Sequence, residues 1–481
     1  MSDGQSTLRR GMRWATVAQV GKLCIQLSGI LILSRLLPPA DFGLMSMAMV
    51  ISGLANLLRD MGMASAIIQR DSISSELLST IFWTSVIFGT GVGVLVASGS
   101  SAVAELFKAP NLAPVLVAMA IVFPITSAGS AHQAILERRS DFRSIAAVEI
   151  ASASLGLIAA ISSALYGLGA LSFALQQIVT SLASLISLRK VSGFSPCRTW
   201  SLDQLRSIWR YSSALSAFNI VNYFARNADN FLIGRYLGAT ELGLYSMAYR
   251  IMLLPIQNVS TSISRALFPS LSRAQNDLDA LRKTYLSAIQ IIAYISAPLM
   301  AGLWVLSDQF VALFFDEKWA KVAELLMWLA PVGFYQSIST TLGVLYQATG
   351  HARPLFATGT VVSAAFVVAI WLGLPSGTVG VVSYYAIAHL IIFLPLFGVP
   401  FHLVGIKFYD LFASTIKPTT SAIIMSGVLV GVRIIWPGLG TSNNALGFIT
   451  QVSLGAIFYS LAITTMTPQL FKHAIRRRHV P

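Results

Sequence analysis

The sequence predicts an all-α integral membrane protein with about fourteen transmembrane helices, built as two parallel six-helix repeats followed by two peripheral C-terminal helices. Composition is the first reason: 55% of the 481 residues are hydrophobic and only 11% are charged. Soluble domains carry about 25% charged residues. A bilayer core about 30 Å thick needs about 20 apolar residues per helix, and almost the whole chain divides into runs of this kind.

Prolines, glycines and charges interrupt the apolar runs and place the helix ends. The first six expected helices cover residues 14–36, 41–60, 77–104, 110–136, 144–165 and 167–189. The next six cover residues 207–235, 241–268, 283–306, 322–348, 354–374 and 377–402, and the last two cover residues 412–435 and 443–467. The expected domains are an N-terminal six-helix lobe (1–190), a cytoplasmic linker (191–206), a C-terminal six-helix lobe (207–405), and two extra helices with a basic cytoplasmic tail (406–481).

An internal repeat is the second reason for this architecture. Residues 34–49 read SRLLPPADFGLMSMAM and residues 234–249 read GRYLGATELGLYSMAY, which share seven identities in sixteen ungapped positions. The acidic Asp41 falls opposite Glu241, at an offset of 200 residues. A helix–turn–helix that recurs in this way indicates two homologous halves. We interpret the repeated turn as structural, with Gly43 and Gly243 allowing close helix approach.

The distribution of basic residues predicts the orientation in the membrane. With the N-terminus in the cytoplasm, the inner segments hold most of the 33 Lys and Arg residues, in a ratio of about four to one over the outer segments. An even number of helices keeps this bias and places both termini in the cytoplasm. Both repeat copies then start on the same side, so an axis along the membrane normal relates them. Loop topology therefore explains the formal charge of +14, and no nucleic-acid partner is expected.

Polar side chains inside the predicted helices carry the functional signal, because ionisable groups at membrane depth usually face a bundle interior or a wet cavity. The first helix carries one polar face with residues spaced by three and four: Gln19, Lys22 and Gln26. The seventh helix carries a matching stripe: Asn219, Asn222, Arg226 and Asp229. Two further candidates lie in the eighth and fifth helices: Arg250 and Glu149. A net basic interior suits an anionic ligand, and a phosphate or diphosphate is the natural choice.

Several of these candidates have a structural alternative that the sequence leaves open. Arg226 and Asp229, three residues apart, either pair with each other or line the ligand site. Glu149 is either a cavity and coupling residue or a helix-end charge at the cytoplasmic surface. Lys22 lies about two turns into its helix and in one interpretation extends towards the lipid headgroups.

The tenth predicted helix holds a second group of polar side chains: Tyr335, Gln336, Ser339, Tyr346 and Gln347. In one interpretation they form a wall compatible with sugars. In the other, which is more common for such residues, they join neighbouring helices by hydrogen bonds.

The sequence contains no catalytic or metal-binding motif. GxxxxGK[ST], HExxH and CxxC are absent, and no outer loop offers paired carboxylates with room for a substrate. The two cysteines, Cys24 and Cys197, cannot build a disulfide framework or a metal cluster, and the six histidines lack metal-ligand spacing. We therefore expect no enzyme activity, no metal and no cofactor. Without a nucleotide-binding domain, energy would come from an ion gradient, the membrane potential or the substrate gradient.

The motif at residues 34–49, followed by NLLRDMGMASAIIQR at 56–70, resembles the bacterial polysaccharide-biosynthesis flippases of the multidrug/oligosaccharidyl-lipid/polysaccharide exporter superfamily. The likeness spans nearly the full chain and is greatest to members of the colanic acid and succinoglycan type. It implies a flippase that moves an undecaprenyl-diphosphate-linked oligosaccharide repeat unit across the inner membrane, for exopolysaccharide or lipopolysaccharide biosynthesis. It also implies two lobes rocking in alternating access among membrane lipids, with a polysaccharide polymerase and a chain-length regulator as partners.

Basic cavity residues are a recurring theme of this family, and the resemblance assigns that role by position to Lys22, Arg226 and Arg250. Two other functions stay open. A cation-coupled drug or metabolite antiporter of the same fold would need a buried carboxylate in the N-terminal half, where Glu149 is the acidic candidate. A membrane polysaccharide polymerase would need a long outer loop with functional Arg or carboxylate residues, and the predicted loops are short.

Overall fold

The computed structural model describes residues 2–60, 74–197, 202–439 and 445–466, although the side chains of residues 2–13, 202–222 and a few others in the helices lie outside the description. Every regular element in these segments is a helix, as the sequence predicts. Within them, ten helical stretches are long and apolar enough to cross a membrane. One of the ten, Ala352–Val404, contains two helices. The protein is therefore a multi-pass membrane protein.

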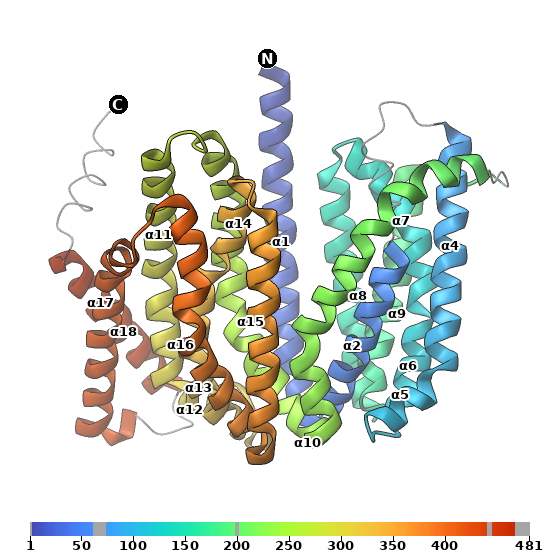
Figure 1. The fold of residues 1–481 in the computed structure, drawn as a ribbon. Helices are drawn as coiled ribbons and strands as arrows, with labels where there is room; N and C mark the ends of the chain where they lie inside the picture. Colours follow the sequence, from blue (N-terminus) through green and yellow to red (C-terminus); the bar gives the residue numbers. More distant parts are fainter. Residues whose placement is uncertain (1, 61–73, 198–201, 440–444, 467–481) are drawn as a thin grey trace. The chain divides into compact units, whose positions relative to one another are not determined.

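The chain folds as two compact units, Met1–Gly243 and Leu244–Pro481. The boundary lies inside one long helix, whereas the sequence divides the lobes at residues 191–206, and that assignment stays a prediction. The helices of the first unit, and the long helix that leaves it, are seen in Figure 1 as α1 (Ser2–Leu36), α2 (Pro39–Asp60), α4 (Ser75–Ser98), α5 (Ser100–Leu106), α6 (Leu112–Ala120), α7 (Val122–Arg138), α8 (Phe142–Leu165), α9 (Leu171–Ser192) and α10 (Leu202–Arg273).

The first unit is organised around α8, which packs against α1 on one side and α9 on the other. α7 contacts both α4 and α9, and α2 contacts α4 and α6. The N-terminus of α9 also receives a side chain from α2, because the Asp41 carboxylate accepts a hydrogen bond from the backbone N–H of Ala170. A carboxylate at this position interacts favourably with the positive end of the helix dipole. Asp41 thus supports α9 as well as the start of its own helix.

The second copy of the repeated turn lies within α10, which is interrupted at Gly238 with φ 88° and ψ −180°. The equivalent position in the first copy is Pro38, between α1, which ends at Leu36, and α2. A positive φ favours glycine, and proline cannot continue a helix through its missing N–H. The two halves therefore break the helix at the same place by different means. This confirms the prediction that one helix ends near residue 235 and the next begins near residue 241.

The two copies of the repeated turn contact each other inside the first unit. A Cβ atom on Gly43 would lie 1.7 Å from the carbonyl oxygen of Ala239, and one on Gly243 would lie 1.8 Å from the carbonyl oxygen of Pro39. Pro39 and Ala239 are equivalent in the repeat, as are the two glycines, so the contact is reciprocal. Reciprocal contacts between equivalent positions are the mark of a local two-fold arrangement. The close approach predicted for these glycines is confirmed.

The second unit begins within α10 and continues through eight further described α-helices: α11 (Leu278–Val305), α12 (Ser307–Phe314), α13 (Lys321–Ser339), α14 (Thr341–Ala348), α15 (Ala352–Gly373), α16 (Gly377–Val404), α17 (Phe408–Ile435) and α18 (Ala445–Met466). α11 packs against α13 and α17, α17 also packs against α18, and α15 pairs with α16 (Figure 1). Tyr285, Phe397 and Phe401 are fully buried in an apolar cluster of this unit.

Short breaks divide three expected spans into two consecutive helices each: 77–104, 110–136 and 322–348. Leu112–Arg138 still forms one apolar stretch long enough to cross a membrane, as predicted for residues 110–136. The breaks fall near residues whose side chains compete for the backbone. Next to the α13–α14 junction, the Thr341 hydroxyl donates to the carbonyl of Ile338 at 2.7 Å. Such hydroxyl-to-carbonyl bonds offer the chain an alternative to the regular helix and often bend it.

Two arginines bind the carboxyl ends of helices in the second unit. Arg282 Nε donates to the carbonyl of Val404 at 2.8 Å, at the end of α16. Arg433 donates to the carbonyl of Val305 at 2.7 Å, at the end of α11, and also pairs with Asp308. A cation at this position satisfies a carbonyl that has no partner within its helix and interacts favourably with the helix dipole.

Candidate functional site

Two predicted site residues of the first unit form an ion pair. Lys22 Nζ on α1 lies 2.6 Å from Glu149 Oε2 on α8. The side chains keep 43% and 32% of their surface exposed. Ionisable side chains in membrane-spanning helices usually face a bundle interior or a wet cavity, because lipid gives neither charge a hydration shell. The sequence names both residues as candidates, and the structure adds that each is the other's partner.

Lys22 and Glu149 lie within two apolar stretches that are each long enough to cross a membrane, Thr16–Leu36 and Phe142–Leu165. The Arg143 guanidinium lies 5.5 Å from the ring centroid of Trp14, and further along both helices Lys22 meets Glu149, so the helices run in the same direction. Tryptophan is typical of the membrane interface. Lys22 is eight residues beyond Trp14, about 12 Å along an α-helix. Glu149 lies about two turns into α8, which favours the cavity interpretation over that of a helix-end charge.

The remaining members of the polar face of α1 stay accessible. Gln19 and Gln26 are exposed. The three-and-four spacing thus produces an accessible polar stripe of Gln19, Lys22 and Gln26, with its charge neutralised by Glu149. Amide side chains beside a cation can donate and accept hydrogen bonds, which suits phosphate and sugar oxygens alike.

The corresponding stripe of α10 is only partly described. The side chains of Asn219 and Asn222 lie outside the described residues. Arg226 is exposed and Asp229 is partly buried. The described contacts include no ion pair between these two, and the choice between pairing and ligand binding stays a prediction.

Arg250, at the start of the second unit, is partly buried within α10. Among the described side chains it has no hydrogen bond or ion pair. A guanidinium presents five N–H donors and a positive charge, a combination that suits an anionic ligand.

The polar residues of the tenth predicted helix mostly join neighbouring helices. Gln336 Nε2 on α13 donates to the Tyr385 hydroxyl on α16 at 2.9 Å. The ring of Tyr335 packs edge-on against His389, also on α16, with centroids 5.1 Å apart. Gln347 remains exposed. The interpretation of this group as interhelical contacts is therefore favoured over a sugar-binding wall.

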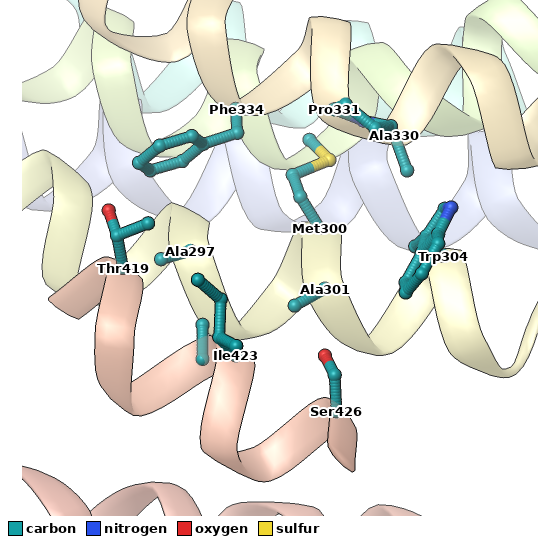
Figure 2. A pocket seen from close by; sticks show the side chains of 11 residues that line it. Ala297, Met300, Ala301, Trp304, Ala330, Pro331, Phe334, Thr419, Ile423 and Ser426 are labelled. Atoms are coloured by element: carbon teal, nitrogen blue, oxygen red, sulfur yellow. The ribbon is translucent and has the colours of Figure 1, made fainter. Parts of the chain in front are cut away.

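The second unit also contains an apolar pocket of about 400 Å³ between α11, α13 and α17. Figure 2 shows Met300 and Trp304 from α11, Phe334 from α13 and Ile423 from α17 around it. The lining offers little polar surface, so the pocket suits a hydrocarbon chain and cannot hold a phosphate or a sugar. A second pocket of about 330 Å³ lies between α11, α17 and α18. The sequence did not predict either pocket, because their residues are ordinary for a membrane helix.

Comparison with solved structures defines the class. The structure of the lipid II flippase MurJ in an inward closed conformation matches with a TM-score of 0.76 at 16% identity, covering 96% of this chain and 100% of that chain. At this identity the likeness shows the fold, which is that of an all-α membrane transporter.

Comparison with curated sequences gives the family. The lipopolysaccharide biosynthesis protein WzxC of Escherichia coli (strain K12) is 28% identical over 79% of this chain and 78% of its own length. The succinoglycan biosynthesis transport protein ExoT of Rhizobium meliloti (strain 1021) is 26% identical over 98% of this chain and 95% of its own length. Residues 32–324 match the family model described as "Polysaccharide biosynthesis protein", so the chain belongs to that family. The resemblance found in the sequence is confirmed.

Proposed function

We propose that this protein is a flippase that translocates an undecaprenyl-diphosphate-linked oligosaccharide repeat unit across the bacterial inner membrane. Family membership supports a role in polysaccharide biosynthesis, and the names of the relatives support transport. The structural observation that supports the proposal is Lys22, whose side chain stays 43% exposed within the apolar stretch Thr16–Leu36, which is long enough to cross a membrane. A transporter for a diphosphate needs positive charge inside the membrane, where lipid provides none.

The proposed ligand has chemically distinct parts, and the described surfaces match them separately. Lys22, Arg226 and Arg250 supply the cations for a diphosphate. The neighbouring amides supply hydrogen bonds for phosphate or sugar oxygens: Gln19, Gln26, Asn219 and Asn222. In the second unit, the pocket between α11, α13 and α17 suits the hydrocarbon chain of a lipid. Asp229 and Glu149 are the acidic residues available for coupling or ion pairing.

The proposed mechanism is alternating access, in which the lobes of residues 1–190 and 207–405 expose the polar stripes first to the cytoplasm and then to the outer side. No covalent chemistry is needed, since the ligand keeps its bonds throughout. We place both termini in the cytoplasm on the evidence of the basic residues. A polysaccharide polymerase and a chain-length regulator would act on the product outside.

The experiment that tests this function is the sidedness of the lipid-linked intermediate. In a strain that lacks the gene, complete undecaprenyl-diphosphate oligosaccharide should accumulate on the cytoplasmic face, while surface polysaccharide is lost. Plasmid-borne protein should restore both. If complete units instead reach the outer face without being polymerised, the protein acts as a polymerase. If intermediates and polysaccharide are unchanged, flipping of this ligand is ruled out.

The second candidate function is a cation-coupled drug or metabolite antiporter of the same fold. Glu149 favours it, because it is an acidic group at membrane depth in the first unit. Its partner weakens the case, since a carboxylate that binds Lys22 at 2.6 Å is already neutralised and leaves no net charge for a cation. Unchanged lipid intermediates in the deletion strain would move this candidate to the front.

A further inference from the structure

We propose that Glu149 is an internal competitor for the anionic ligand of Lys22. In the empty protein its carboxylate takes the place that a ligand phosphate takes in the loaded one, and the ligand displaces it. This inference rests on the proposed function, because it assumes a diphosphate at Lys22. It gives Glu149 a function, although a basic site would attract an anionic ligand without any acidic residue.

The geometry allows an exchange that never leaves Lys22 without an anion. An ammonium group has three N–H donors, and the described contact uses one carboxylate oxygen, Oε2. Among the described side chains neither residue has another polar contact. With 43% of its side chain exposed, Lys22 can donate a second N–H to a phosphate oxygen before its contact with Glu149 breaks.

The packing around the pair allows the carboxylate to leave without separating the two helices. One residue before Lys22, Gly21 lies so close to α8 that a Cβ atom there would be 2.9 Å from Ile150 Cδ1. The contact between Arg143 and Trp14 joins the same helices nearer the membrane interface. α1 and α8 are therefore held together by contacts that do not depend on the ion pair, and Glu149 can move as a side chain alone.

Competition between Glu149 and the ligand for Lys22 helps the transporter to release the ligand. A transporter must bind its ligand strongly enough to load it and weakly enough to unload it. A lone lysine at membrane depth would hold a diphosphate tightly and would be left as an unpaired charge afterwards. Glu149 lowers the affinity by occupying Lys22 and neutralises the lysine again when the ligand leaves.

The test measures binding and export in the same variants. The full chain is placed in nanodiscs of phosphatidylcholine, and binding of farnesyl diphosphate is compared with binding of farnesol. Glu149→Gln should bind the diphosphate about fivefold more tightly, the size expected for removal of one partly exposed competing charge. Export by the same variant in cells should fall, because release slows. The exposed carboxylate at the start of α4 gives the matched control: Glu76→Gln should change neither quantity.

Two further variants keep the test decisive if a single change harms folding. Lys22→Gln should lose diphosphate binding but leaves Glu149 unpaired in the membrane. Lys22→Gln with Glu149→Gln removes both charges, keeps an amide pair, and should be folded yet bind weakly. Tight binding by this double variant would mean that Lys22 is not the ligand's partner, and the inference would be wrong.

Other outcomes separate this inference from the proposed function. If Glu149→Gln binds the diphosphate no better than the unchanged protein, the competitor role is excluded, while the deletion phenotype can still stand. If phosphatidylglycerol in the nanodisc displaces the probe at ordinary bilayer content, Lys22 serves general anionic lipid and the competitor role for a transported ligand fails. If binding tightens while the deletion strain shows unchanged intermediates, Glu149 competes with a different anion and the proposed flippase function falls instead.

Discussion

The three basic residues proposed for ligand binding differ in what surrounds them. Lys22 is paired with Glu149, whereas Arg226 and Arg250 have no polar contact among the described side chains. No ion pair among the described side chains accounts for the position of either arginine. At the residue scale, both arginines differ from Arg282, whose guanidinium donates a hydrogen bond to the carbonyl of Val404.

Replacing Lys22, Arg226 and Arg250 together by Gln should abolish export without loss of the protein from the membrane. Each charge-assisted contact to phosphate contributes roughly 1.5–3 kcal/mol, which is about tenfold or more in affinity. The measurement is surface polysaccharide in the deletion strain, with membrane abundance checked by immunoblot. The control replaces by Gln three exposed basic residues at helix ends of the second unit: Arg273, Lys283 and Arg353. Full export by the triple site variant would refute the basic ligand site.

The identity of the site residues could be predicted from the sequence, but their partners could not. Lys22 and Glu149 stand out because charged residues are rare in apolar runs. Their pairing depends on the register of two helices far apart in the chain, and a single sequence carries no signal for it. For the same reason, the sequence does not predict the hydrogen bond between Asp41 and the N-terminus of α9. The local pattern indicates only that Asp41 suits the start of its own helix.

At the scale of the element, helix positions followed from hydropathy while helix interruptions did not. The fifth predicted helix, residues 144–165, is observed as α8 (Phe142–Leu165). The expected span 322–348 is divided into α13 and α14, because the break depends on hydroxyl-to-carbonyl bonds that do not change hydropathy. The apolar pocket between α11, α13 and α17 could not be predicted either, because a space between helices depends on packing and not on residue class.

The crossing of the repeated turns gives a prediction for these elements. Gly43→Ala places a methyl group against the backbone carbonyl of Ala239, which cannot rotate away, so α2 or α10 must shift. Overpacking of this kind costs about 1–3 kcal/mol, and we expect a lower thermal midpoint of the detergent-purified protein together with reduced export. Gly243→Ala should behave alike, because its contact with Pro39 is the reciprocal one.

Gly91→Ala in α4 is the matched control for this crossing. It lies in the same unit, and a Cβ atom there would meet no atom within 4 Å. Alanine favours a helix over glycine by up to about 1 kcal/mol, so the control should be as stable as the unchanged protein or more so. A midpoint for Gly43→Ala equal to that of the control would contradict the close crossing.

At the scale of the whole molecule, the excess of basic residues on one side predicts which ends of the helices face the cytoplasm. One residue of the first unit can report which side of the membrane this end of the helices faces. Cys197, in the segment after α9, is hydrogen-bonded to residues near the beginning of α4. Trp83 Nε1 donates to the carbonyl of Cys197 at 2.8 Å, and the backbone N–H of Cys197 donates to Ser79 at 3.0 Å. Cys197 therefore lies near the first turns of α4, and Glu105 lies beyond the opposite end of that helix.

Labelling of Cys197 tests the orientation of the whole chain. Cys197 is exposed, so in a Cys24→Ser background a membrane-impermeant maleimide should label inverted membrane vesicles and leave intact spheroplasts unlabelled. A second variant carries Glu105→Cys with both native cysteines replaced by Ser, and it should give the opposite pattern. α4 is long and apolar enough to span the bilayer, so the two positions must differ. Labelling of Cys197 from outside would reverse the predicted orientation and place both termini on the outer side of the membrane.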